Sequence, residues 1–235
     1  MRYDTDCLSK HREPKEGEFD FSGNFDLKAY ITMAESLVLN VIVRPGPYIC
    51  AEREFGGLPA WLLTYEKMVL RCNDPLFLSK LSRYLKTVLG KIRPHLASQG
   101  GNVIMLQIEN EYGSYGNDKE YLRAIAKIYE EAGMDCLCFT ADGPYYTMLS
   151  GGTLPEYLAV ANFGSKPETY LSVLAEYRPE RLSCAENIGA AGLTIGLKSI
   201  IQEVPRTSLR TLRASSVWVH PSAFICSTAV PISGL

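Results

Sequence analysis

Acidic and amide side chains follow the ends of several short apolar segments in this chain. Continuously apolar segments of this length are expected for strands that are buried on both faces of a parallel sheet. A carboxylate at a strand end can bind a hard cation, or it can work with a second carboxylate to hydrolyse a glycosidic bond. The side chains that share this placement are Glu52, Glu54, Glu109, Asn110, Glu111, Asp142 and Asn162.

The pair Asn110–Glu111 is the sharpest of these features. Neighbouring side chains of a regular strand point to opposite faces, so both can reach one pocket only if the chain bends as it leaves the sheet. The next residues contain Gly113 and Gly116, which permit such a bend. An amide beside an acid can hold a sugar hydroxyl near a proton donor. The alternative is an ordinary solvated turn.

Metal binding is the weaker of the two chemistries. His11, His95 and His220 lie at no spacing typical of metal ligands, and the chain has no C-x-x-C pair. The seven cysteines are scattered along the sequence, which fits neither a zinc site nor a disulfide framework. We therefore expect no metal and no cofactor.

Strand-like and helix-like segments alternate along the chain. Apolar residues at spacings of three and four predict helices over 27–37, 78–92, 121–132 and 171–177, while 38–44, 103–108, 135–140 and 157–161 are expected to be strands. This order is typical of βα units, found in a (β/α)₈ barrel or an open doubly wound sheet. No glycine-rich phosphate-binding motif follows a strand, and the acidic residues follow the carboxyl ends, so the barrel is favoured.

Composition excludes several classes of function. The chain has 235 residues, with 24 Lys and Arg against 26 Asp and Glu, so it lacks the basic excess expected for nucleic-acid binding. No apolar run reaches the ~20 residues needed to span a membrane. The first six residues, MRYDTD, contain no apolar h-region, so we expect no signal peptide. Compartment and oligomeric state are left open.

Three blocks of the chain closely resemble glycoside hydrolase family 35, the β-galactosidases. They are GGNVIMLQIENEY at 100–112, RPGPYICAE at 44–52 and EFGGLPAWL at 54–62. The resemblance runs from about residue 13 to about residue 181. It implies a (β/α)₈ catalytic barrel that removes terminal β-galactosyl residues from a β-galactoside with retention of configuration, without a cofactor. Members of the family are commonly lysosomal, secreted or extracytoplasmic.

The resemblance also implies roles for individual residues. Glu111 falls on the general acid/base after the fourth barrel strand, and Glu186 stands at the distance expected for the nucleophile. Asn110, Ala51 and Glu52 fall on galactose-binding positions. Glu109 is not the acid of the family, and a structural hydrogen-bonding role is expected for it.

The ends of the chain depart from the family pattern. Residues 9–14 read SKHREP where the family has Trp-Asn-x-His-Glu-Pro, and the first strand and most of the second have no counterpart. After Glu186 the expected aromatic motif is absent. Codons that encode residues 187–196 can be chosen so that, read two bases later, they give Tyr-Trp-Cys-Gly-Trp-Phe-Asp-His-Trp, which matches that motif. We infer a change of reading frame near residues 180–182, which the nucleotide sequence would test.

The fold expected from the sequence is therefore α/β, a partial (β/α)₈ barrel with an unpatterned C-terminal tail. Residues 1–181 would form part of a glycoside hydrolase catalytic domain, and residues 182–235 an aberrant or disordered tail. The expected function is that of a β-galactosidase-like enzyme. The alternative is an inactive fragment that binds carbohydrate or a partner protein.

Overall fold

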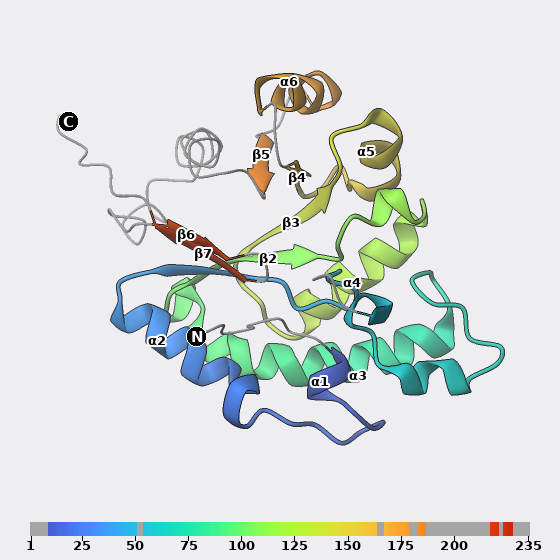
Figure 1. Cartoon of the computed structure of the whole chain (residues 1–235), viewed down its shortest axis with the longest axis vertical. Coiled ribbons are helices and arrows are strands. Elements are labelled where there is room, and N and C mark those ends of the chain that lie inside the picture. Colours follow the sequence, from blue (N-terminus) through green and yellow to red (C-terminus); the bar gives the residue numbers. More distant parts are fainter. Residues whose placement is uncertain are drawn as a thin grey trace.

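The computed structural model describes residues 9–50, 54–163, 167–178, 183–186, 217–220 and 223–227. Its centre is one seven-stranded sheet with the strand order β5-β4-β3-β2-β1-β7-β6 (Figure 1). The five strands from β1 to β5 are parallel, whereas β7 pairs antiparallel with both β1 and β6. The strands are β1 (Asn40–Val43), β2 (Val103–Ile108), β3 (Leu137–Asp142), β4 (Leu158–Asn162), β5 (Ser183–Glu186), β6 (Val217–His220) and β7 (Ala223–Ser227).

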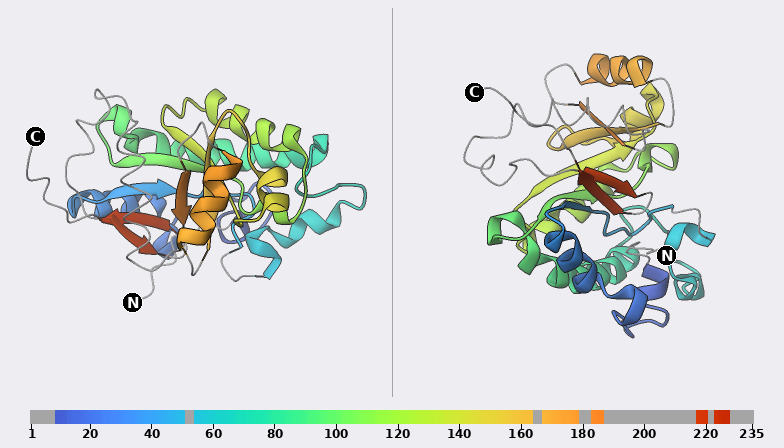
Figure 2. Two further views of the ribbon diagram at one scale, coloured as in Figure 1. Left: turned by 90° about the horizontal axis from the view of Figure 1, so that it is seen from above. Right: turned by 60° about the vertical axis from the view of Figure 1, so that its left-hand side comes forward.

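Four of the described α-helices connect successive parallel strands, and the other two precede β1. Those of the described residues are α1 (Ser9–Arg12), α2 (Leu27–Ser36), α3 (Pro75–Ile92), α4 (Lys119–Glu131), α5 (Tyr146–Gly152) and α6 (Pro167–Tyr177). Short 3₁₀ turns are η1 (Gly23–Phe25), η2 (Glu54–Gly57), η3 (Ala60–Thr64), η4 (Arg93–His95), η5 (Ala97–Gln99) and η6 (Tyr112–Ser114). In Figures 1 and 2, α2, α3 and α4 lie side by side along the sheet, as the helices of successive βα units do in a barrel.

The same local signal starts each of the helices α2, α3 and α4. An aspartate at the N-cap accepts a hydrogen bond from a backbone N–H three residues later, which satisfies one of the unpaired donors of the first turn. The pairs are Asp26 with Ala29 (2.9 Å), Asp74 with Phe77 (2.8 Å) and Asp118 with Tyr121 (3.1 Å). The N-caps therefore set the helix starts locally.

Apolar side chains bury the sheet from both sides. The main cluster joins α2, α3 and α4 to the strands and includes Ile31, Leu85, Leu106 and Ile125, each fully buried. A second, smaller cluster of Met105, Phe139, Ala141 and Val160 comes from β2, β3 and β4. Burial on both faces explains why these strands are apolar throughout, without alternation.

The fold predicted from the sequence is confirmed: the structure is α/β and forms part of a (β/α)₈ barrel. All four predicted strands are present, the second with the predicted ends. The first begins later, at Asn40, because Leu37 caps α2 and Val38 takes a positive φ of 58° before the strand can start. Of the predicted tail, β5, β6 and β7 are described, and its other residues lie outside the described part.

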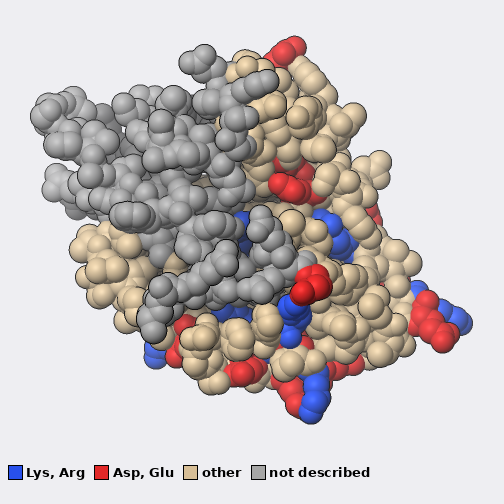
Figure 3. All heavy atoms as spheres, viewed as in Figure 1, with Lys and Arg blue, Asp and Glu red and all other residues tan. Residues whose placement is uncertain are grey.

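The surface of the described residues carries charges of both signs. In the view of Figure 3, Lys and Arg side chains are interspersed with Asp and Glu, as the net charge of -2 leads one to expect. Among the helices that the structure describes, none has both the length and the apolar character needed to cross a membrane.

Candidate active site

The chain bends sharply as it leaves β2. Glu109 and Glu111 have positive φ values of 59° and 49°, so the backbone departs from the strand at both residues. The N–H of Glu111 donates to the carbonyl of Ala141 on β3 at 2.8 Å, which fixes the turn against the neighbouring strand. The predicted bend after β2 is thus confirmed, and it frees Asn110 and Glu111 from the alternation of a regular strand.

Glu109 is buried and its carboxylate is saturated with donors. Arg71 binds it in a bidentate manner, with Nε at 2.9 Å and Nη2 at 2.8 Å. The hydroxyl of Tyr121 donates at 2.9 Å, and the N–H of Asn110 donates at 2.6 Å. Glu109 therefore has the structural role expected for it, because it holds together the loop, the strand end and α4.

Arg71 is a residue of this site that the sequence did not reveal. Its guanidinium lies between the rings of Tyr48 and Tyr115, at 3.8 and 4.3 Å from their centroids. Its Nη2 also donates to the carbonyl of Asn110 at 3.0 Å. Burial alone would lower the pKa of Arg71, but the charge and hydrogen bonds of Glu109 more than offset this and raise it. No spacing signal marks Arg71, because it lies 38 residues before its partner.

The side chain of Asn110 is held in one orientation. Its Oδ1 accepts hydrogen bonds from Arg44 and from Nε2 of Gln107, the latter at 3.0 Å. Gln107 also donates to the carbonyl of Glu109 at 2.6 Å, which ties the amide to the turn. Because two donors occupy Oδ1, Asn110 can offer a ligand only its Nδ2 group.

Glu111 differs from its neighbours in having few restraints on its carboxylate. The side chain is half-buried, and its Oε1 accepts one hydrogen bond, from Nδ2 of Asn162 at 3.2 Å. Asn162 is the last residue of β4, so the amide reaches Glu111 from a different strand. A carboxylate with one neutral donor and partial access to solvent can still exchange a proton with a ligand.

Asp142 is a second buried acid in the site, at the end of β3. Burial raises its pKa to about 7, and the charges of Glu109 and Glu111 act in the same direction. The N–H of Gly113 donates to its Oδ1 at 2.7 Å, and together with Lys119 it opposes the rise. Asp142 thus couples the end of β3 to the turn that carries Glu111.

Two glycines allow this close packing. A Cβ on Gly113 would lie 1.7 Å from the carbonyl oxygen of Met148, and one on Gly152 would lie 1.9 Å from Oδ1 of Asp142. Either contact is far inside van der Waals distance, so any larger residue would have to displace the turn or the acid. Both positions require glycine for space.

The other predicted site residues lie wholly or partly outside the described residues. Ala51 and Glu52 are among those left out. Glu186 is the last residue of β5, and the strand register places it opposite Asn162 on β4. Its side chain lies outside the described part. The backbone therefore brings Glu186 to the same edge of the sheet as Asn162, Asp142 and the turn after β2.

Among the described residues, no group of three or more His, Cys, Asp and Glu side chains is arranged to hold a metal ion. The lone pairs of Glu109 are used by protein donors, and Asp142 is buried against Gly113 and Gly152. What this edge of the sheet offers is a half-buried carboxylate next to an oriented amide.

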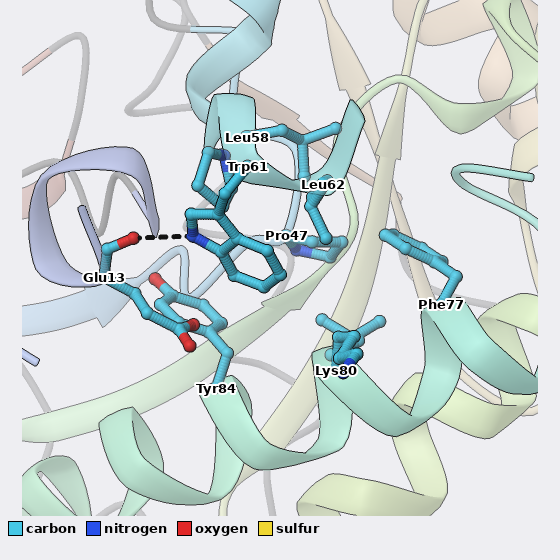
Figure 4. Close-up of a pocket in the computed structure, with 10 residues that line it drawn as sticks. Glu13, Pro47, Leu58, Trp61, Leu62, Phe77, Lys80 and Tyr84 are labelled. Carbon is cyan, nitrogen blue, oxygen red and sulfur yellow. Dashed lines mark hydrogen bonds between the residues drawn. The ribbon is translucent and has the colours of Figure 1, made fainter. Parts of the chain in front are cut away.

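A small pocket lies elsewhere, between α3 and η3 (Figure 4). Trp61 donates to the carbonyl of Glu13 at 2.9 Å, and the Glu13 carboxylate binds Arg83 and, at 2.7 Å, the N–H of Gly17. Most of the lining is apolar, and it includes none of the residues that follow β2, β3 and β4. The polar groups of this pocket are paired with one another, as expected of a packing feature.

Comparisons with known proteins agree with this geometry. The family model described as "Glycosyl hydrolases family 35" matches residues 10–203. A protein of Xanthomonas manihotis named "Beta-galactosidase" is 44% identical over 171 residues, which cover 72% of this chain and 28% of the relative. Proteins of the same name from Mus musculus and Homo sapiens are 45% and 44% identical over 155 residues, covering 65% of this chain and 24% and 23% of theirs. The chain thus spans about a quarter of the length of these relatives.

Proposed function

Because this chain belongs to the glycosyl hydrolases of family 35, we propose that it carries the core of a β-galactosidase active site with Glu111 as general acid/base. The observation that supports this assignment is the difference between the surroundings of Glu109 and Glu111 in one turn. Glu109 is saturated by four donor groups, whereas Glu111 is half-buried with a single amide donor. Of the two carboxylates, Glu111 alone has the freedom that proton transfer requires.

The proposed reaction proceeds in two displacements. A carboxylate nucleophile attacks the anomeric carbon while the bond from that carbon to the aglycone oxygen breaks, and Glu111 gives its proton to this oxygen. Glu111, now ionised, then takes a proton from water, and the water oxygen displaces the nucleophile from the sugar. The configuration is retained because the carbon is inverted twice.

We assign the nucleophile to Glu186. Retaining enzymes place the two carboxyl groups about 5–5.5 Å apart, on opposite sides of the scissile bond. The pairing of β5 with β4 in register at Asn162 and Glu186 supports this role, since it brings Glu186 to the edge where Glu111 lies. The Nδ2 group of Asn110 is proposed to bind a sugar hydroxyl, and Ala51 and Glu52 to complete the galactose contacts.

We propose that residues 1–181 belong to the catalytic barrel, with residues 182–235 as an aberrant tail. The family match extends to residue 203, and β5 begins at Ser183, so family-like structure continues for at least a few residues beyond this boundary. Sequencing the transcript across the codons for residues 175–200 tests the proposed change of frame. A transcript that continuously encodes the family motif in the other frame would support it.

Turnover of a chromogenic β-galactoside by the whole chain tests the enzymatic proposal. Replacing Glu111 by Gln should lower kcat/KM by about 10²–10⁴-fold, the usual contribution of a general acid. Glu120→Gln is a matched control, because Glu120 is an exposed glutamate of α4 whose partner is Arg123. Equal rates for the wild type and Glu111→Gln would refute the assignment.

A second function, binding without turnover, is favoured by one observation. The Asn110 amide is held in one orientation with its Nδ2 group available to a sugar hydroxyl, which binding requires whether or not hydrolysis follows. Galactose-dependent thermal stabilisation in the absence of turnover would support this function. Stabilisation that survives in Glu111→Gln but is lost in Asn110→Ala would locate the binding site.

A further inference from the structure

The amide of Asn162 is partnered on one side only. Its Nδ2 donates to Oε1 of Glu111 at 3.2 Å, while its Oδ1 is buried and has no hydrogen-bond partner among the described residues. The side chain as a whole is 8% exposed. A buried acceptor without a donor lowers stability, since its lost hydration is not replaced.

An apolar residue of similar size would avoid this cost. The fold gains nothing from Oδ1, so the feature that accounts for an amide at the end of β4 is the hydrogen bond from Nδ2 to Glu111. The contact with the carboxylate also fixes which end of the amide is the NH₂ group, because only that group can donate to a carboxylate. The contact is therefore well defined chemically.

Resting on the proposed role of Glu111, we propose that Asn162 is a positioning residue that keeps Oε1 as a hydrogen-bond acceptor and so directs the catalytic proton to Oε2. A carboxylic acid carries its proton on one oxygen. Because Nδ2 needs a lone pair on Oε1 in both protonation states, the proton occupies Oε2, from which it passes to the aglycone oxygen. When Glu111 acts as base, Oε2 receives the proton from water in the same way.

The neutrality of the amide matters for this role. A lysine or arginine here would hold Glu111 in its ionised form, and an aspartate would add a like charge at hydrogen-bond distance. Other charged groups near Asn162 are Asp142 on β3, Glu109 after β2, Lys119 on α4 and Glu186, whose backbone lies opposite Asn162 on β5. An amide can orient the acid without adding to these charges.

Substrates with different leaving groups separate this role from a general loss of structure. Acid catalysis matters most for a poor leaving group such as the alcohol of methyl β-galactoside, and least for 2,4-dinitrophenolate. Asn162→Leu removes the amide donor and keeps a side chain of similar size. It should lower kcat for methyl β-galactoside by about 10–10²-fold, the cost of a misplaced catalytic group, with less than about threefold loss for the dinitrophenyl substrate.

Asn102 supplies the matched control. It is also buried, its Nδ2 donates to the carbonyls of Ile31 and Leu39, and its Oδ1 is likewise unpartnered. Asn102→Leu therefore removes an equally buried amide that lies at the opposite end of β2 from the site. It should lower stability without separating the two substrates. Equal losses on both substrates in Asn162→Leu would overturn the proposal.

A titration that needs no turnover gives an independent test. In protein labelled with ¹³C at the glutamate carboxyl, the spectrum of Glu111→Gln identifies the Glu111 signal. Asn162→Asp places a second carboxylate against it, so its titration midpoint should rise by about one pH unit or more. An unchanged midpoint in both Asn162→Asp and Asn162→Leu would refute the contact. Absence of turnover in the wild type would instead refute the proposed function.

Discussion

Glu109 and Glu111 are separated by one residue, yet their surroundings are opposite. Glu109 is 2% exposed and binds Arg71, Tyr121 and the backbone of Asn110. Glu111 is half-buried and accepts one hydrogen bond from an amide on another strand. The first carboxylate is fixed by charge-assisted bonds that leave it no lone pair to share, and the second keeps an oxygen for a ligand.

This difference shows that a rigid backbone turn can carry a side chain that is itself lightly bonded. Arg71 binds both the Glu109 carboxylate and the carbonyl of Asn110, so the ion pair fixes the backbone on the near side of Glu111. Gly113 and Asp142 fix it on the far side. Glu111 is thus carried by a turn that is held at both ends, while its own side chain remains lightly bonded.

The largest expected effect comes from removing the buried charge. Glu109→Gln leaves Arg71 buried without its partner, which should lower the free energy of unfolding by about 3–5 kcal/mol. Glu111→Gln should change it by less than about 1 kcal/mol, since the glutamine oxygen can still accept the hydrogen bond from Asn162. Urea denaturation followed by circular dichroism measures both. Similar losses in the two variants would remove the distinction between these acids.

The next effect depends on pH and concerns Asp142. Its pKa is about 7 in the folded protein and near 3.8 when unfolded, so the folded state holds the proton over this interval. The contribution of Asp142 to stability is therefore greatest below about pH 4, and it is lost as the pH rises to about 7. A shift of this size corresponds to about 4 kcal/mol.

Asp142→Asn isolates this contribution, because the amide oxygen can still accept from Gly113. We expect the variant to be more stable than the wild type by about 2–4 kcal/mol at pH 8, and similar to it at pH 4. All other titrating groups are common to both proteins, so their contributions cancel in the difference between the two free energies of unfolding. A difference that does not vary between pH 4 and 8 would show that Asp142 does not hold a proton in the folded state.

A smaller effect should follow from adding a methyl group beside Asp142. Gly152→Ala forces a methyl group against the Asp142 carboxylate and should cost about 1–3 kcal/mol. Gly90→Ala is the control, because no atom lies within 4 Å of the added carbon, and it should stabilise α3 by about 0.5–1 kcal/mol. Thermal unfolding distinguishes the two. A neutral Gly152→Ala would mean that Asp142 can move away at no cost.

The smallest effect is expected on the surface. Arg123 pairs with Glu156 at 2.7 Å and with Glu120 at 2.8 Å, with side chains that are 40% or more exposed. Exposed ion pairs contribute little, so Arg123→Gln should leave the midpoint of urea denaturation almost unchanged. A change as large as that of Glu109→Gln would show that burial does not explain the strength of the Arg71 pair.

The order of the elements could be predicted because its signals are local. Helix periodicity, N-cap aspartates and short apolar runs each act over a few residues, and the resulting βα units are present in the structure. The bend after β2 was also predictable, since neighbouring residues of a regular strand cannot share a pocket. The ends of most other elements shift by one to four residues, and α5 has no counterpart among the predicted helices. The start of β1 has a clear local cause, since the capped end of α2 and the positive φ of Val38 delay the strand.

By itself, the sequence determined the family, the βα order and the strand end at which the acids gather. The tertiary structure decided which of those acids is bound and which is left open. Arg71, Asn162 and Asp142 reach the turn from separate segments, and their hydrogen bonds exist only once the sheet has formed. Spacing along the chain carries no record of such contacts, because they depend on distances in space and on the exclusion of water.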